Sequence, residues 1–359
     1  MNERRQDLYY ADYLRLSTML DLQHPESCRY GNEAHDEMLF IIVHQTYELW
    51  FKEILHELKS VLDLFAPVPL ETRKLGIIVA RLERIQMIQK VINQQIGILE
   101  TMTPLDFLDF RDFLIPASGF QSVQFREIEL RLGLAAQLQP GVYSRLSAED
   151  RGYLEQVAQQ PSLFDRIDAW LGRMPFLEFE DFNFWKSYRQ AVETMLETDR
   201  RSILDNPTLS SGEKDQQLVG LENTRHLFNS LLEPTGFQAL RQQGTFRLSQ
   251  ESVLSALFIN LYRDEPLLQL PFRLLTHLMD IDEQWTAWRS GHALMAQRML
   301  GGKIGTGGTS GHEYLKETVE KKRIFSDLFN LSTFLIPRSA LPVLPPDVKR
   351  SLGFYMAGE

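Results

Sequence analysis

Helical periodicity is the feature of this sequence that most constrains its fold. Apolar residues recur every three or four positions over 37–64 and 72–99, which predicts two long amphipathic helices. The same spacing predicts further helices over roughly 119–132, 147–158, 180–203, 212–231, 249–263 and 283–300. Short blocks of Val, Ile and Thr bounded by turn residues, which are typical of strands, do not occur. We therefore expect an all-α protein.

The organisation along the chain predicts one large helical domain over 1–359. We expect a helical insertion around 150–250, and a polar loop over 205–214. The tail over 332–359 holds four prolines and is expected to be irregular. A charged beginning and the lack of a long apolar run in the first third predict neither a secretory signal nor a membrane span. The expectation is a soluble, cytoplasmic protein.

Charge and cysteine content exclude several classes of partner. The 359 residues include 38 Lys and Arg against 48 Asp and Glu, a formal net charge of −10. Nucleic acids and anionic membranes bind clustered positive charge, so neither is expected as a partner. Cys28 is the only cysteine, which rules out an internal disulfide and a zinc or iron–sulfur site held by cysteines. A single thiol also fits a reducing compartment.

Two motifs that suggest metal or phosphate binding fail on inspection. Glu53 and His56 form one Glu-x-x-His motif, whereas a di-iron bundle needs two, so a solvated helix face is the better interpretation. The glycine-rich stretch 301–311 resembles a phosphate loop, but Ile304 follows Lys303 where Ser or Thr is required. It is either a helix C-cap followed by a flexible loop, or a loop that folds over a ligand.

Two histidines lie in apolar stripes of separate predicted helices. One stripe consists of Trp285, Trp288, His292, Met295 and Met299, spaced three or four residues apart. The other contains Phe40, His44, Tyr47 or Glu48, and Phe51. A histidine in such a stripe is more often a core residue bonded to a carbonyl, but it also suits the axial position of a haem. Two such helices fit a haem with a proximal and a distal side.

Arg111 is the third candidate, because it lies between Phe110 and Phe113 in an apolar stretch. It either pairs with Asp112 or Glu129 as part of the structure, or presents its guanidinium to a carboxylate ligand. Structural salt bridges are the commoner case, and the spacing alone leaves both open.

Several motifs in register resemble the tryptophan 2,3-dioxygenase family. They are the segments 10–16, 35–50, 110–112, 116–122, 288–292 and 305–311. The likeness runs in order from about residue 8 to residue 338 and is weakest over 135–250. It implies an all-helical enzyme that binds haem b and assembles as a homotetramer. Such an enzyme inserts O₂ across the indole C2–C3 bond of L-tryptophan, giving N-formyl-L-kynurenine in the first step of tryptophan degradation by the kynurenine pathway.

The resemblance also implies roles for the residues that could hold the cofactor and the indole. His292 would be the proximal haem ligand, and His44 would lie on the distal side and accept a hydrogen bond from the indole N–H. Phe40 and Phe107 would line the indole pocket, and Ser118 would lie near the haem edge. Some family members have Tyr where this chain has Phe107, so the pocket loses a hydroxyl here.

Further roles concern the amino-acid end of the substrate. Arg111 would pair with the carboxylate, and Thr306 would bind the ammonium and carboxylate groups. The N-terminal residues Tyr10, Tyr13 and Leu14 resemble a segment that completes a neighbouring subunit's pocket.

Three other functions remain open. A related haem enzyme acting on a modified tryptophan or indole would share every motif quoted. A non-catalytic haem sensor or carrier would share the histidines, but it would not need Arg111 and Thr306 together. A helical interaction protein without a cofactor would show no Soret band after purification.

Overall fold

The computed structural model describes residues 7–66, 72–134, 146–174, 178–179, 182–301 and 322–353. The α-helices of these residues are α1 (Tyr10–Tyr13), α2 (Leu16–Met19), α3 (Glu26–Arg29), α4 (Glu37–Phe65), α5 (Thr72–Leu99), α6 (Pro104–Arg111), α7 (Val123–Leu132), α9 (Ala148–Ala158), α10 (Leu163–Leu171), α11 (Phe184–Asp205), α12 (Ser211–Leu232), α13 (Pro234–Gln242), α14 (Gln250–Leu261), α15 (Gln269–Leu300), α17 (Ser326–Asn330) and α18 (Pro346–Leu352). Short 3₁₀ turns are η1 (Asp112–Leu114), η2 (Gly119–Gln121), η4 (Pro266–Leu268), η5 (Leu331–Phe334) and η6 (Arg338–Ala340). The described strands are β1 (Glu178–Phe179) and β2 (Phe182–Asn183), paired antiparallel. The all-α expectation is confirmed.

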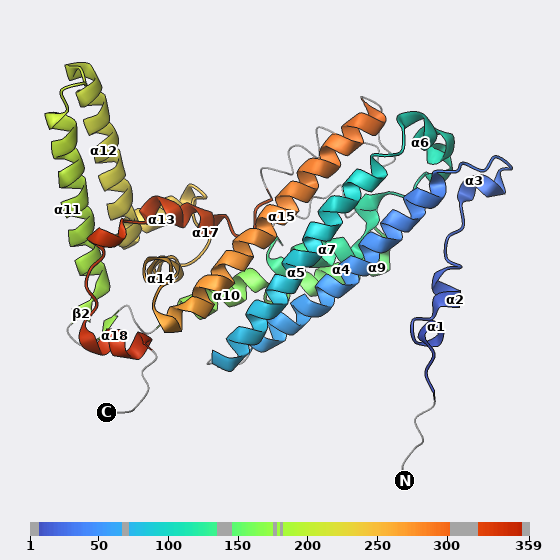
Figure 1. Cartoon of the computed structure of the whole chain (residues 1–359), viewed down its shortest axis with the longest axis horizontal. Helices are drawn as coiled ribbons and strands as arrows, with labels where there is room; N and C mark the ends of the chain where they lie inside the picture. Colours follow the sequence, from blue (N-terminus) through green and yellow to red (C-terminus); the bar gives the residue numbers. More distant parts are fainter. Residues whose placement is uncertain are drawn as a thin grey trace, which may run out of the picture.

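Three long helices, α4, α5 and α15, form the centre of the molecule and lie side by side (Figure 1). Their facing sides carry a continuous set of buried aliphatic residues. Two polar side chains of α5 also bond to α15: Gln89 donates to the carbonyl of Ile281 at 3.2 Å, and Asn93 donates to Gln284 Oε1 at 2.9 Å. These bonds fix how far α15 is shifted along α5.

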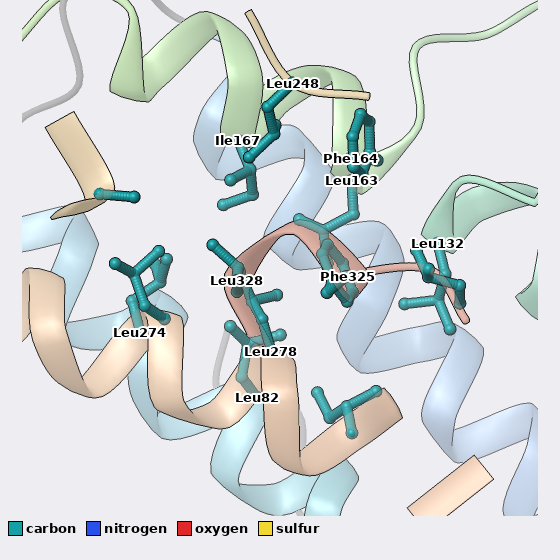
Figure 2. Close-up of a cluster of buried hydrophobic side chains, with 14 of the residues drawn as sticks. Leu82, Leu132, Leu163, Phe164, Ile167, Leu248, Leu274, Leu278, Phe325 and Leu328 are labelled. Carbon is teal, nitrogen blue, oxygen red and sulfur yellow. The ribbon is translucent and has the colours of Figure 1, made fainter. Parts of the chain in front are cut away.

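The second part of the core lies where α10, α15 and the segment before α17 meet (Figure 2). Phe164 and Phe325 stack at 6.2 Å between ring centroids, and Leu274 and Leu278 of α15 are fully buried in the same cluster. Gly133 ends α7 with φ at +125°, and a Cβ there would lie 2.6 Å from Phe164 Cβ. Only glycine allows this close approach, which holds the end of α7 against α10.

Helix boundaries follow local signals that the periodicity partly missed. The predicted helix 283–300 begins earlier, at Gln269. Pro271 is compatible with this start, because an N–H in the first helical turn has no intrahelical partner to lose. The predicted helix 180–203 begins at Phe184 after the β1–β2 pair, and Asn183 caps it by accepting from the Lys186 N–H. The predicted helix 119–132 is divided into η2 and α7.

Helices α6, α10 and α13 were not predicted, although α6 carries a visible start signal. Thr103 and Asp106 form a capping box around Pro104, the first residue of α6. The C-terminal tail contains η6 and the short helix α18 as well as irregular chain. Within the described residues, no helix is both long and apolar enough to span a membrane.

Candidate functional site

The candidate site is a mostly apolar cavity of about 280 Å³ between α4, α7, α15, the end of α5, α6 and the η2 turn. Its α15 wall includes Trp288, His292, Met295 and Met299, which are residues of the stripe predicted from the sequence. The α4–α6 wall includes Phe40, His44 and Phe107. The structure therefore brings both predicted histidines to one cavity, although they lie on helices far apart in the chain.

His292 is held by ring stacking. Its imidazole is parallel to the Trp288 indole, with 5.1 Å between centroids and an interplanar angle of 1°. No residue of the described chain forms a hydrogen bond with its ring nitrogens. Burial, with a smaller contribution from His44, lowers the pKa of His292 to about 4. The ring is therefore neutral at pH 7, and a nitrogen of a neutral imidazole can bind a metal ion.

Close helix packing positions His292. The preceding residue, Gly291, faces α5, and a Cβ at this position would lie 3.0 Å from Ile96 Cδ1. Glycine therefore allows α15 to lie close to α5, and Ile96 itself lines the cavity.

His44 is fixed by a hydrogen bond instead. Its Nδ1 lies 2.7 Å from the Phe40 carbonyl oxygen, one helical turn earlier, so Nδ1 carries the proton and donates. In the neutral ring, Nε2 is then an acceptor. Burial lowers the pKa of His44, which the Phe40 carbonyl and Glu48 only partly offset. His44 therefore presents one acceptor nitrogen, surrounded by aromatic rings such as Phe40 at 4.0 Å.

The aromatic side of the cavity is built by contacts between α4 and α6. Phe40 contacts Phe107 and Phe110 at 5.8 and 5.5 Å between centroids, and Phe110 is fully buried. Phe107 lines the cavity. These contacts place the last turn of α6, which ends at Arg111, next to the cavity.

Arg111 lies beside this site but is not among the residues that line the cavity. Its side chain is 15% exposed, and Nη1 lies 3.4 Å from Asp112 Oδ1, a carboxylate that is itself 79% exposed. Asp112, one of the two structural partners predicted for Arg111, therefore lies close to it. Glu129 is paired elsewhere, with Arg126, Arg289 and Lys322.

Ser118 lines the cavity from the loop before η2. Its hydroxyl accepts a hydrogen bond from the Phe120 N–H, and Gln121 Oε1 accepts from the Ser118 N–H, so a capping box fixes this loop. Ser118 and Phe120 thus come to the cavity from a short turn whose geometry is set by its own sequence.

The remaining candidates do not line the cavity or lie outside the described residues. Tyr10 and Tyr13 of α1 are 73% and 69% exposed, and Leu14 follows them at the surface. Helices α1 and α2 lie apart from the central bundle (Figure 1). Thr306 and the rest of 302–321 lie outside the described residues.

Sequence reasoning missed the polar part of the cavity. Arg126, Glu129, Arg289 and Lys322 also line it, from α7, α15 and the chain before α17. The spacing of Arg126 and Glu129, three residues apart on one helix, was the only sequence signal. Their clustering with Arg289 and Lys322 depends on tertiary packing.

The fold and the site together define an all-α protein with an aromatic cavity between two neutral histidines. Comparison with known proteins gives the family. A family model described as tryptophan 2,3-dioxygenase matches residues 2–335. A protein of this name from Alteromonas mediterranea is 51% identical over 361 residues, covering 99% of this chain and 100% of that protein. Two others of the same name, from Bdellovibrio bacteriovorus and Xenopus laevis, are 52% and 43% identical; the alignments cover 97% and 96% of this chain, and 98% and 86% of those proteins. The chain belongs to the tryptophan 2,3-dioxygenase family.

Proposed function

We propose that this protein is a haem-dependent dioxygenase that opens the indole ring of L-tryptophan with O₂, giving N-formyl-L-kynurenine. The observation that supports this most is the juxtaposition of His44 and His292 on one aromatic cavity, in a chain that belongs to the tryptophan 2,3-dioxygenase family. This reaction is the first step of tryptophan degradation by the kynurenine pathway. Such an enzyme needs a cofactor that handles O₂, a pocket for the indole and a clamp for the amino-acid end.

The residues of the cavity fit haem b. His292 offers a neutral imidazole that no described residue engages by a hydrogen bond, and the adjoining lining is aromatic or rich in methionine. Within the part of the chain that the structure describes, no group of three His, Cys, Asp or Glu residues could hold a metal ion by itself. An imidazole-held porphyrin iron is therefore the metal that suits this donor set. When bound, haem supplies O₂ binding and activation.

The other proposed residues act on the substrate. His44 Nε2 accepts the indole N–H, because its Nδ1–H is already donated to Phe40. Phe40 and Phe107 pack against the indole and exclude water. Arg111 binds the carboxylate through a bidentate, charge-assisted pair, and Thr306 binds the ammonium and carboxylate end. Ser118 lies at the cofactor edge.

We include in the proposal a homotetramer in which the N-terminal segment completes a neighbouring site. The exposed aromatic rings of Tyr10 and Tyr13 on one short helix support it, because aromatic residues are enriched at protein–protein interfaces. We also propose that residues 1–359 form one functional domain with a helical insertion at 150–250. The single cysteine, Cys28, fits the cytoplasm, which we propose as the location.

One experiment tests the function directly. The purified protein is reduced anaerobically with dithionite, mixed with L-tryptophan and exposed to air, while the absorbance of N-formylkynurenine is recorded. Steady product formation is expected. A Soret band without turnover would instead support a haem sensor or carrier, and turnover only of substituted indoles would support the related biosynthetic enzyme.

A further inference from the structure

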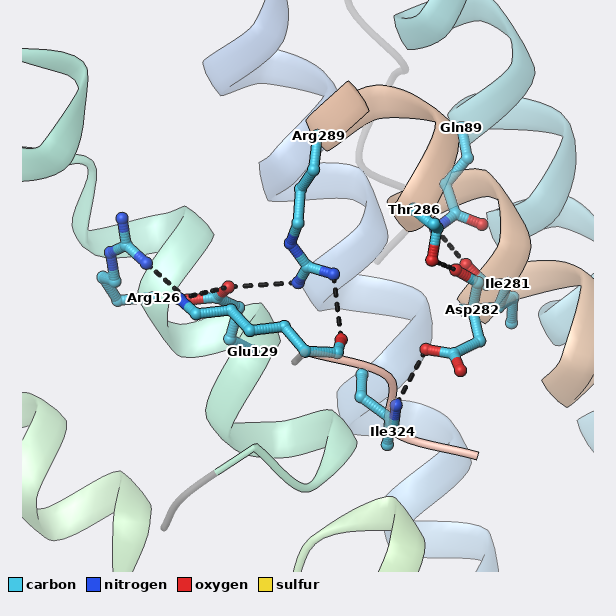
Figure 3. A network of polar contacts seen from close by, with 9 residues as sticks. Gln89, Arg126, Glu129, Ile281, Asp282, Thr286, Arg289 and Ile324 are labelled. Atoms are coloured by element: carbon cyan, nitrogen blue, oxygen red, sulfur yellow. Dashed lines mark hydrogen bonds and ion pairs between the residues drawn. The ribbon is translucent and has the colours of Figure 1, made fainter. Parts of the chain in front are cut away.

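Glu129 lies at the centre of a buried group of cations in the cavity lining (Figure 3). Its carboxylate lies 2.5 Å from Arg126 Nη1, 3.1 Å from Arg289 Nη2 and 3.7 Å from Lys322 Nζ. We call these four residues the Glu129 cluster. Each is at most 8% exposed, so water compensates their charges poorly.

The cluster holds more positive than negative charge. Glu129 is the one carboxylate of the described residues within ion-pair distance of these three cations. Glu48, the other acidic residue of the lining, accepts a hydrogen bond from Gln124 instead. Asp282 is near Arg289, but it accepts the N–H groups of Ile324 and Phe325 and does not line the cavity (Figure 3). Three cations therefore face one nearby carboxylate.

Hydrogen-bond donors of the cluster also remain available. Arg289 uses Nη2 for Glu129 and Nη1 for the Lys322 carbonyl, which saturates much of its fork. Among the described residues, Arg126 donates a hydrogen bond through Nη1 only, and its buried Nε has no hydrogen-bond partner. Within the same part of the chain, the Lys322 ammonium pairs with Glu129 alone, at the long distance of 3.7 Å. Arg126 and Lys322 are thus the members of the Glu129 cluster that can bind a further anion.

We propose that Arg126 and Lys322 form a carboxylate subsite of the cavity and that a propionate carboxylate of the haem occupies it. This inference rests on the proposed function. A resident cofactor suits the subsite better than a substrate, because a ligand that leaves after each turnover would leave the buried cations without its counter-charge in every cycle. Arg111, which is more exposed and lies outside the cavity lining, remains the partner of the substrate carboxylate.

The test compares haem b with its dimethyl ester, in which both propionates are neutral. Full-length protein produced without haem is titrated with each, and the Soret absorbance gives both dissociation constants. We expect the parent to bind the free acid roughly tenfold more tightly than the ester, as a charge-assisted contact in a buried site would give. In Arg126→Met and Lys322→Met, this preference should fall below about threefold.

A matched control lies on the same helix. Arg131 also pairs with a buried glutamate, Glu127, at 2.7 Å, but it does not line the cavity. Arg131→Met should therefore keep the full preference for the free acid. If it loses that preference as completely as Arg126→Met does, the effect is a general disturbance of α7 and the inference is wrong.

Other outcomes separate the possible failures. Equal binding of acid and ester by the parent overturns the subsite without any variant, even if Arg126→Met does not fold. If Arg126→Met keeps the acid preference but no longer distinguishes L-tryptophan from tryptamine in a binding titration, the subsite belongs to the substrate and the assignment to haem is wrong. Absence of a Soret band with either porphyrin overturns the proposed function itself.

Discussion

The two walls of the cavity each present a neutral histidine, but they fix it by different means. His44 on the α4–α6 wall donates its Nδ1 proton to a carbonyl of its own helix. His292 on the α15 wall is stacked on Trp288 and forms no hydrogen bond within the described chain. The first arrangement fixes a tautomer and leaves one acceptor for a substrate N–H. The second leaves a ring nitrogen for a metal. The difference shows that the immediate partner of a histidine, more than its burial, decides the chemistry available to it.

The largest effect is expected on the α15 wall. His292→Ala removes the imidazole proposed to bind iron, so the purified protein should lose most of its haem, measured as Soret absorbance per protein. His277→Ala is the matched control, because His277 lies on the same helix, contacts Gln86 at 3.3 Å and does not line the cavity. Full haem content and an unchanged ferrous spectrum in His292→Ala would show that another residue is the ligand.

The next largest effect concerns the amino-acid clamp beside the α4–α6 wall. Arg111→Leu removes the proposed carboxylate partner, which costs roughly 2–5 kcal/mol for a largely buried charge pair. We expect kcat/KM for L-tryptophan to fall by about 30-fold or more, with haem content unchanged.

Asp112→Asn separates this role from a structural salt bridge. Asp112 is highly exposed, and its contact with Arg111 is long, so the substitution should change kcat/KM less than about twofold. If Asp112→Asn lowers kcat/KM as much as Arg111→Leu does, the ion pair between Arg111 and Asp112 is structural, and the proposed binding of the substrate carboxylate by Arg111 is wrong.

His44→Ala tests the α4–α6 wall itself. Loss of the acceptor for the indole N–H should lower kcat/KM by about tenfold, the effect of one lost hydrogen bond to a buried partner, while haem stays bound. Relative to L-tryptophan, 1-methyl-tryptophan should gain in this variant, because it has no N–H to lose. Loss of haem in His44→Ala would show that His44 binds the iron, and the roles assigned to His44 and His292 would then be wrong.

The smallest effect expected is that of pH near neutrality. Burial lowers the pKa of His44 below its usual 6.5, so the acceptor form persists above that pH and is lost by protonation only below it. We expect kcat/KM to change less than about twofold between pH 7 and 8 and to decline below pH 6.5. A decline with a midpoint above pH 7 that disappears in His44→Ala would contradict a lowered pKa.

Much of the local structure could be predicted from the sequence. Periodicity identified α4 and α5 with nearly correct ends, because long amphipathic helices repeat their signal many times. It also placed Trp288, His292 and Met295 on one helix face. Short helices such as α6 were missed, since their few residues carry little periodicity and their start depends on one capping box.

Local periodicity is enough to tell which face of each helix is apolar and which histidines lie on those faces. Packing between distant segments brings the faces of α4 and α15 to one cavity, and gathers Arg126, Arg289 and Lys322 around Glu129. The physical reason is that helical periodicity arises from neighbours three and four residues apart, whereas the partner of each face depends on packing between distant segments. From the sequence, a charged residue such as Arg289 is expected to be exposed to water, but packing between distant segments buries it.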